Sequence, residues 1–237
     1  MSAFELLGFG EKGWGALLLQ ATAMTLAVTL TAFLFGAVFG AIVARGKLSD
    51  SVTARVAGDV YTTVLRGVPD LLVIYLLYFG GSQLLSSIYR LATGETGFIG
   101  INAFLTGAMA VGVVSGAYQA EVFRGAYLAI PRGEIEAARS VGMSGWTLFH
   151  RIVLPQVLRF AIPGLGNVWQ LALKESALIS VTGLTELLRQ SQVASGSTRQ
   201  PFVFYSAAAA LYLVLTSLST WTFNKAERTA MRGVRRA

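Results

Sequence analysis

The sequence predicts an all-α polytopic membrane protein with five transmembrane helices. Hydrophobic residues make up 54% of its 237 residues and charged residues only 13%, where roughly a quarter is usual for soluble domains. The apolar residues gather in runs of about 20 residues or more, the length that crosses a bilayer as a helix. The predicted spans are 16–44, 71–89, 98–120, 160–185 and 201–224, within a single domain of residues 1–237.

Each of the first three spans has its own features. Residues 16–44 carry no charged side chain and lead into a basic loop. Residues 71–89 have about the minimum length for a crossing helix. Residues 98–120 are rich in glycine and alanine, and small residues let helices approach closely inside a membrane. We expect this close approach at Gly107, Gly112 and Gly116.

The fourth span contains polar and helix-breaking residues, whereas the fifth is uncharged and precedes a basic tail. Pro163 and Asn167 lie early in the fourth span, and Lys174 and Glu175 lie further on. Proline removes a backbone N–H from the helical bonding pattern. We therefore expect a broken helix around 163–167 that exposes backbone groups to a solute path.

The distribution of basic residues predicts the orientation of the spans. Most of the 19 lysines and arginines fall on one side of the predicted membrane, and positively charged loops of membrane proteins face the cytoplasm. We expect the N-terminus outside, and the C-terminus and the loop 121–159 in the cytoplasm. Because the basic residues lie at the ends of apolar runs, topology and anionic lipid explain the net charge of +7, and nucleic acid is not an expected partner.

Residue types that carry out catalysis are scarce. The chain contains no cysteine and a single histidine, His150, so a thiol nucleophile or a histidine-rich metal cluster is excluded and an intramembrane enzyme is disfavoured. No Gly-x-x-x-x-Gly-Lys-Ser/Thr motif occurs, so any ATP hydrolysis must occur on another polypeptide. We expect no cofactor on this chain.

The loop 121–159 has the features of a short helix with a defined start and end. Pro131 suits the first turn, and Glu134 and Glu136 complement the positive end of the helix dipole. Gly142 ends the helix, because glycine adopts the left-handed conformation at low cost.

A second short helix is predicted to follow directly. Ser144 caps it, and it carries Trp146, Phe149 and Ile152. Pro155 predicts the next break. An ordinary helix–turn–helix connection lying on the membrane surface is the alternative explanation of these residues.

The spacing within this loop resembles the coupling loop in the membrane subunits of bacterial ABC importers. Glu-Ala-Ala at 136–138 is followed by Gly142 and then by Ile-Val-Leu-Pro at 152–155. In that family the loop forms short helices that bind in a cleft of the ATPase subunit. The resemblance assigns ATPase coupling to Glu136, Ala137, Ala138, Gly142, Ile152, Leu154 and Pro155.

Further motifs look like the polar amino acid permease branch of this family, in the subgroup that serves histidine, arginine and opines. The resemblance covers about 22–224, nearly the whole chain. Asp70, where many members have an apolar residue, and Glu134, where glutamine is common, depart from the pattern. The motifs are Arg66–Pro69, Glu121–Gly125, Ile130–Gly133, Pro163 with Asn167, and Lys174–Leu178.

The resemblance implies a type I ABC importer membrane subunit of the bacterial inner membrane, which forms the path for ATP-driven uptake of polar, above all basic, amino acids or opines. The implied partners are a dimer of ABC ATPase subunits that binds ATP and Mg²⁺, a second permease subunit, related or identical, and an extracytoplasmic solute-binding protein. An ion-coupled secondary transporter of small polar solutes is the alternative, but it leaves the loop 121–159 unexplained.

Five residues are candidates for lining the solute path: Asp70, Glu121, Asn167, Lys174 and Glu175. Charged residues at membrane depth are costly and usually face a cavity, so a carboxylate at Asp70 favours a cationic substrate group. Structural alternatives remain open: Asp70 as a partner of a helix dipole, Glu121 as a partner of a nearby arginine, and the pair 174–175 bound to neighbouring helices or a sister subunit. Adjacent helical residues do not face each other, so Lys174 and Glu175 are not expected to pair.

Overall fold

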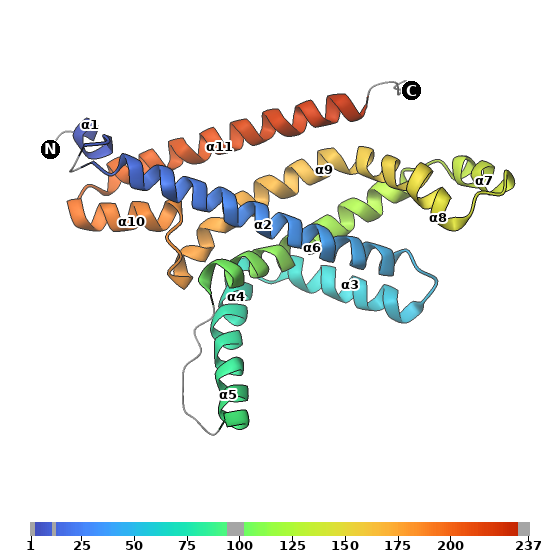
Figure 1. Cartoon of the computed structure of the whole chain (residues 1–237), viewed down its shortest axis with the longest axis horizontal. Coiled ribbons are helices and arrows are strands. Elements are labelled where there is room, and N and C mark those ends of the chain that lie inside the picture. Colours follow the sequence, from blue (N-terminus) through green and yellow to red (C-terminus); the bar gives the residue numbers. More distant parts are fainter. Residues whose placement is uncertain (1–2, 11–12, 94–101, 232–237) are drawn as a thin grey trace.

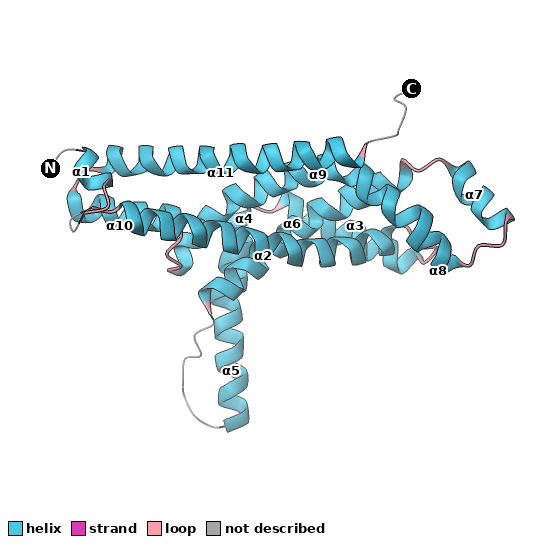
Figure 2. Cartoon of the chain, turned by 45° about the horizontal axis from the view of Figure 1, so that its top comes forward, coloured by secondary structure: helices cyan, strands magenta, loops and turns pink. Residues whose placement is uncertain are grey.

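The computed structural model describes residues 3–10, 13–93 and 102–231, and this part of the chain consists of helices and connecting turns, without a β-strand (Figures 1 and 2). The α-helices are α1 Ala3–Leu7, α2 Gly15–Lys47, α3 Val52–Gly67, α4 Asp70–Tyr75, α5 Gly81–Thr93, α6 Ala103–Leu128, α7 Arg132–Ser140, α8 Gly145–Leu148, α9 Leu154–Glu175, α10 Leu187–Thr198 and α11 Pro201–Ala230. A π-helical turn, Leu76–Gly80, joins α4 to α5, and a second, Phe149–Val153, joins α8 to α9. A 3-10 helix, Ser176–Thr182, follows α9.

The long helices form a bundle whose two ends differ. Helix α6 packs against α2 and α9, and α11 packs against α9 and α10. Helices α7 and α8 lie at one end of the bundle, and α1 and α10 lie at the opposite end (Figure 1). Helix α5 leaves the bundle as an arm in both views, and α4, at the base of this arm, packs against α6 (Figures 1 and 2).

Glycines bring α6 close to its neighbours, which confirms the prediction for 98–120. A Cβ atom at Gly112 would lie 2.9 Å from the carbonyl oxygen of Ala32 in α2. A Cβ atom at Gly107 would overlap the side chain of Ile179. A Cβ atom at Gly116 would lie 3.0 Å from the Tyr61 hydroxyl oxygen in α3 and 3.2 Å from Phe39 Cβ in α2. Larger side chains here would force the helices apart.

Four helical segments of the described residues are long and apolar enough to cross a membrane. They correspond to the predicted spans 16–44, 71–89, 98–120 and 201–224, although residues 98–101 lie outside the described part. The four segments are Gly15–Lys47, Asp70–Leu91, Ala103–Leu128 and Pro201–Ala230.

All four segments continue beyond their predicted ends, and α6 and α11 extend the furthest. Helix α6 continues to Leu128, because the Glu121 carboxylate pairs with the Arg124 guanidinium one turn later, which stabilises a helix. Helix α11 continues to Ala230, and the Lys225 ammonium lies 5.1 Å from the centroid of the Trp221 ring in the added turns. The loop predicted to begin at residue 121 therefore begins only after Leu128.

Helix α9 differs most from its prediction. It begins at Leu154, within the predicted loop, and passes through Pro163 without a break to Glu175. The predicted break at 163–167 is therefore wrong, and 160–185 is not one α-helix. Packing against α6 explains the continuity: a Cβ atom at Gly164 would lie 2.9 Å from the Val122 side chain, so the two helices are in close contact around the proline.

Pro155 does not break the chain either. The helical path runs from α8 through the π-helical turn into α9, and Pro155 lies in the first turn of α9. A π-helical turn is wider than an α-helical one, which leaves room for a proline ring beside the preceding carbonyl groups. The predicted break at Pro155 is wrong, and the connection between α6 and α9 narrows to residues 129–153.

Candidate functional site

Residues 129–153, which connect α6 to α9, contain most of the residues predicted to contact an ATPase and are called the coupling segment below. The first helix of this segment ends as the sequence predicts. Gly142 has a φ of +78°. Its N–H donates to the Arg139 carbonyl oxygen at 3.0 Å, and the Met143 N–H donates to the Ala138 carbonyl oxygen at 3.2 Å. This pair of bonds is a Schellman motif, which satisfies carbonyl groups at a helix end. It fixes the direction in which the chain leaves α7.

The second helix begins at the predicted cap. Ser144 Oγ accepts a hydrogen bond from the Thr147 N–H at 3.3 Å. The Trp146 ring stacks on the His150 ring, with centroids 5.8 Å apart and planes inclined by 15°. Trp146 is 73% exposed and Phe149 is also exposed. The helix α8 therefore presents an aromatic surface at the end of the bundle.

The residues predicted to couple to an ATPase lie on both the exposed and the packed side of the segment. A hydrogen bond of 2.6 Å from Gln156 Nε2 to Glu134 Oε2 ties the start of α9 to α7. The small alanine side chains of α7 leave room for another protein to approach. Glu136, Ala137, Gly142 and Pro155 are exposed, Ile152 and Leu154 are half-buried, and Ala138 is buried.

Two of the five path candidates, Asp70 and Glu175, lie together. Glu175 is only 5% exposed, and neither of its carboxylate oxygens has a hydrogen-bond partner among the described residues. The Asp70 carboxyl, at the start of α4, interacts with it electrostatically. The Arg66 guanidinium lies 5.3 Å from the centroid of the Tyr118 ring, and Asp70 and Glu175 also act electrostatically on Tyr118. These four residues, from α3, α4, α6 and α9, form the Asp70–Glu175 cluster.

The sequence placed Arg66 in a motif but assigned it no role, and it did not single out Tyr118. Their side chains join the cluster because α3 and α6 pack against each other. The motif Arg66–Pro69, which directly precedes Asp70, is the sequence feature that could have indicated a role for Arg66 in this cluster.

The other path candidates lie elsewhere. Lys174 is exposed whereas Glu175 is buried, and no hydrogen bond joins Lys174 to either Glu175 oxygen. Asn167 is exposed and lines a pocket of about 230 Å³ between α9 and α11. The polar side chains around it are Gln170, Thr220, Asn224 and Glu227.

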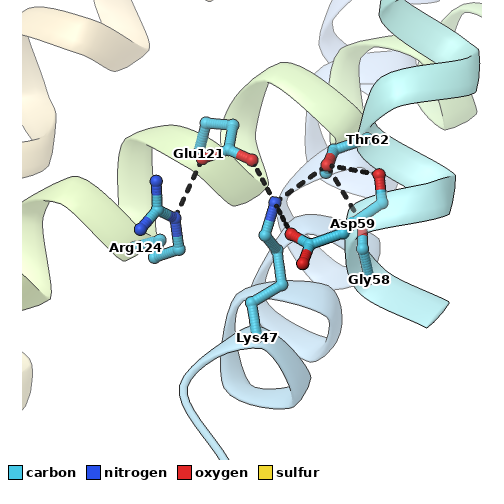
Figure 3. A network of polar contacts seen from close by, with 6 residues as sticks. All are labelled: Lys47, Gly58, Asp59, Thr62, Glu121 and Arg124. Atoms are coloured by element: carbon cyan, nitrogen blue, oxygen red, sulfur yellow. Dashed lines mark hydrogen bonds and ion pairs between the residues drawn. The ribbon is translucent and has the colours of Figure 1, made fainter. Parts of the chain in front are cut away.

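Glu121 belongs to a network of ion pairs that joins α2, α3 and α6. Figure 3 shows the Lys47 side chain pointing from the end of α2 toward Asp59, Thr62 and Glu121. Lys47 Nζ lies 2.9 Å from Asp59 Oδ1 and donates to Thr62 Oγ1 at 2.9 Å and to Glu121 Oε1. Glu121 Oε2 accepts from Arg124 Nε at 2.9 Å, the arginine pairing that the sequence had left open. These five residues are called the Lys47 network below.

A helical bundle with an exposed coupling segment at one end is the arrangement expected of a transporter membrane subunit. The family model described as the binding-protein-dependent transport system inner membrane component matches residues 36–229. The chain belongs to this family. The resemblance inferred from the motifs is thereby confirmed, and the chain is the membrane-spanning permease subunit of an ABC importer, a transport component of the inner membrane rather than an enzyme.

Curated members of this permease family match the chain along its whole length. It is 58% identical over 236 residues to an octopine transport system permease protein of Rhizobium radiobacter, covering 100% of this chain and 99% of the relative. It is 48% identical to a nopaline transport system permease protein of Agrobacterium fabrum, covering 97% and 98%. It is 37% identical to the histidine/lysine/arginine/ornithine transport system permease protein of Escherichia coli, covering 95% and 98%.

Solved permease structures share the fold. A crystal structure of an amino acid ABC transporter with histidines is similar with a TM-score of 0.76 and 31% identity, covering 91% of this chain and 95% of that chain. An inward-facing methionine ABC transporter is similar with a TM-score of 0.73 and 19% identity, covering 94% and 100%. The second likeness is one of fold alone.

Proposed function

We propose that this permease carries basic amino acids or opines, compounds that combine a cationic group with a carboxylate. The octopine, nopaline and histidine/lysine/arginine/ornithine permeases to which the chain is similar support this substrate class by their names. The observation that carries the proposal is the Asp70–Glu175 cluster. It places two carboxyl groups, an arginine and a tyrosine from four helices in one location.

The carboxyl groups of this cluster suit a cationic substrate. Glu175 is buried with two oxygens that accept no hydrogen bond from the described residues, an unfavourable arrangement for a carboxylate in a protein interior. A guanidinium or ammonium group of a substrate supplies donors to Glu175 and Asp70, and Arg66 supplies a cation for the substrate carboxylate. The proposed path therefore passes the start of α4 and the end of α9.

The proposed assembly has five spans in this chain, because α9 crosses together with the four apolar segments. The N-terminus lies outside and the C-terminus in the cytoplasm, which places the coupling segment where an ATPase dimer with bound ATP and Mg²⁺ reaches it. Glu136, Ala137, Ala138, Gly142, Ile152, Leu154 and Pro155 form the ATPase contact. A second permease subunit, related or identical, completes the path, and an extracytoplasmic solute-binding protein delivers the substrate.

The alternative considered from the sequence, an ion-coupled secondary transporter, has no support among the permease relatives. The exposed aromatic surface of α8 also favours a protein partner over a chain that works alone.

Reconstitution tests the proposed function. The tagged chain is purified from membranes in mild detergent with the proteins that accompany it, and the complex is placed in proteoliposomes with ATP on the coupling-segment side. We expect an ATPase and a second permease to co-purify, and uptake of octopine or arginine to require both ATP and the binding protein. Uptake driven by an ion gradient after ATP depletion would show that the proposal is wrong.

A further inference from the structure

The Lys47 network is buried more deeply than an ordinary surface ion pair. The Lys47 side chain is 7% exposed and the Glu121 side chain 23% exposed, whereas Asp59 is 63% exposed. A Cβ atom at Gly58 would lie 2.5 Å from Lys47 Cγ, so the absence of a side chain at this position makes room for the lysine stem. Figure 3 shows Gly58 beside this stem. The space beside Gly58 therefore holds the Lys47 side chain where its ammonium group reaches both α3 and α6.

The network lies at the point where the bundle continues into the coupling segment. Glu121 and Arg124 occupy the last two turns of α6, which ends at Leu128, and α7 begins at Arg132. On the other side, Lys47 is the last residue of α2. Displacement of α7 by a bound ATPase reaches the bundle through the end of α6 that carries Glu121, and also through α9, to which the Gln156–Glu134 hydrogen bond ties α7.

We infer that Lys47 and Glu121 are positioning residues for transport, whose ion pair makes the cytoplasmic ends of α2, α3 and α6 move together with the coupling helix α7. This inference rests on the proposed ATP-driven import. When the pair is intact, movement of α6 displaces α2 and α3 as one body, which is rigid-body switching. When the pair is broken, only helix packing holds α3 and the end of α2 to α6, so they follow its movement less closely, and ATP hydrolysis continues with less substrate transported.

Coupled transport in proteoliposomes tests the inference with variants that keep side-chain shape. Glu121→Gln removes one charge and Lys47→Met removes the other, and the double variant removes both. Uptake and ATP hydrolysis are measured in the same vesicles, with the complete complex of permeases, ATPase and binding protein. We expect each single variant to transport at least about fivefold less substrate per ATP hydrolysed, the lower range of coupling effects between sites. ATP hydrolysis itself is expected to stay close to the wild-type rate.

The double variant and a control separate this role from independent effects. If one contact is responsible, the double variant has the same coupling ratio as either single variant. If the two effects multiply, or if the single variants transport normally, the inference is wrong. Asp50→Asn, which removes an exposed carboxylate in the turn between α2 and α3, is the matched control and is expected to retain the wild-type ratio. Failure of the wild-type complex to transport with ATP instead contradicts the proposed function.

A distance measurement tests the inference without transport, in case a variant assembles poorly. The chain has no cysteine, so single cysteines introduced at exposed positions, Val56 in α3 and Leu128 in α6, accept spin labels selectively. In the wild-type background we expect the distance distribution between the labels to stay unchanged when ATP is trapped. In the Glu121→Gln background we expect it to shift or broaden. Equal behaviour of both backgrounds, or a shift in the wild type, overturns the inference.

Discussion

The carboxyl groups of Asp70 and Glu175 lie next to each other although they belong to different helices, α4 and α9. Two neighbouring carboxyl groups repel each other when both are charged. Apart from the Asp70 carboxyl group itself, no residue in the described part of the chain offers Glu175 a hydrogen bond. A cationic group of a substrate reduces the repulsion between the two carboxyl groups and supplies hydrogen-bond donors to Glu175.

Asp70→Asn and Glu175→Gln are expected to weaken uptake of cationic substrates more than uptake of neutral ones. Loss of a buried charge contact commonly costs about 2 kcal/mol or more, so the KM for arginine or octopine is expected to rise by about 30-fold or more. The measurement is concentration-dependent uptake in proteoliposomes, with a neutral amino acid as the comparison. An equal loss for both substrates contradicts the assignment of these carboxylates to cation recognition.

Gly142→Ala is expected to weaken coupling to the ATPase by straining the turn after α7. A residue with a side chain pays about 1–2 kcal/mol in the left-handed conformation that Gly142 adopts at φ +78°. Gly145→Ala is the matched control, because Gly145 lies in the same segment with open space around it and without a positive φ. We expect only the variant at 142 to lower the amount of ATPase that co-purifies with the chain. The same loss in both variants would show that the turn is not the cause.

Gly112→Ala is expected to destabilise the bundle by about 1–3 kcal/mol, the usual cost of overpacking. The added methyl group would lie 2.9 Å from the Ala32 carbonyl oxygen, and a backbone atom cannot move aside. Gly125→Ala, in the same helix but with open space around it, is expected to be neutral or slightly stabilising, since alanine favours a helix more than glycine does. Thermal unfolding in detergent measures both. Equal midpoints would argue against close packing of α2 and α6.

The parts of the site that depend on neighbouring residues were predictable from sequence. The turn at Gly142 and the cap at Ser144 follow from local backbone chemistry, and the structure contains both. The helices in the apolar segments could likewise be predicted from the residues within each segment. Pro163 shows where a local rule fails, because contact between Gly164 and Val122 keeps α9 helical through the proline.

The parts that depend on contacts between distant segments were not predictable. Lys47 looked like one basic residue in a loop, since nothing in its neighbourhood indicates that Glu121 lies beside it. Glu186 directly follows the predicted span 160–185, but it is fully buried and caps α10 by accepting hydrogen bonds from the N–H groups of Leu188 and Arg189. Its Oε2 also accepts from the Tyr212 hydroxyl at 3.2 Å, which ties α10 to α11.

Trp146→Ala is expected to weaken binding of the ATPase because it removes the most exposed large side chain of α8. Trp146 is 73% exposed and stacked on His150, so its ring is held in place before any partner binds. Truncation of a tryptophan at the centre of an interface commonly costs about 2 kcal/mol or more, which corresponds to a loss of affinity of about 30-fold. Binding of the purified ATPase to the chain in nanodiscs measures this effect.

Trp221→Ala is the matched control, because Trp221 is 63% exposed but belongs to α11, outside the coupling segment. This variant is expected to retain the wild-type affinity. Since both variants remove a similar exposed aromatic area, a loss confined to Trp146 assigns the ATPase contact to α8. Equal affinities of both variants and the wild type would show that Trp146 is not part of this contact.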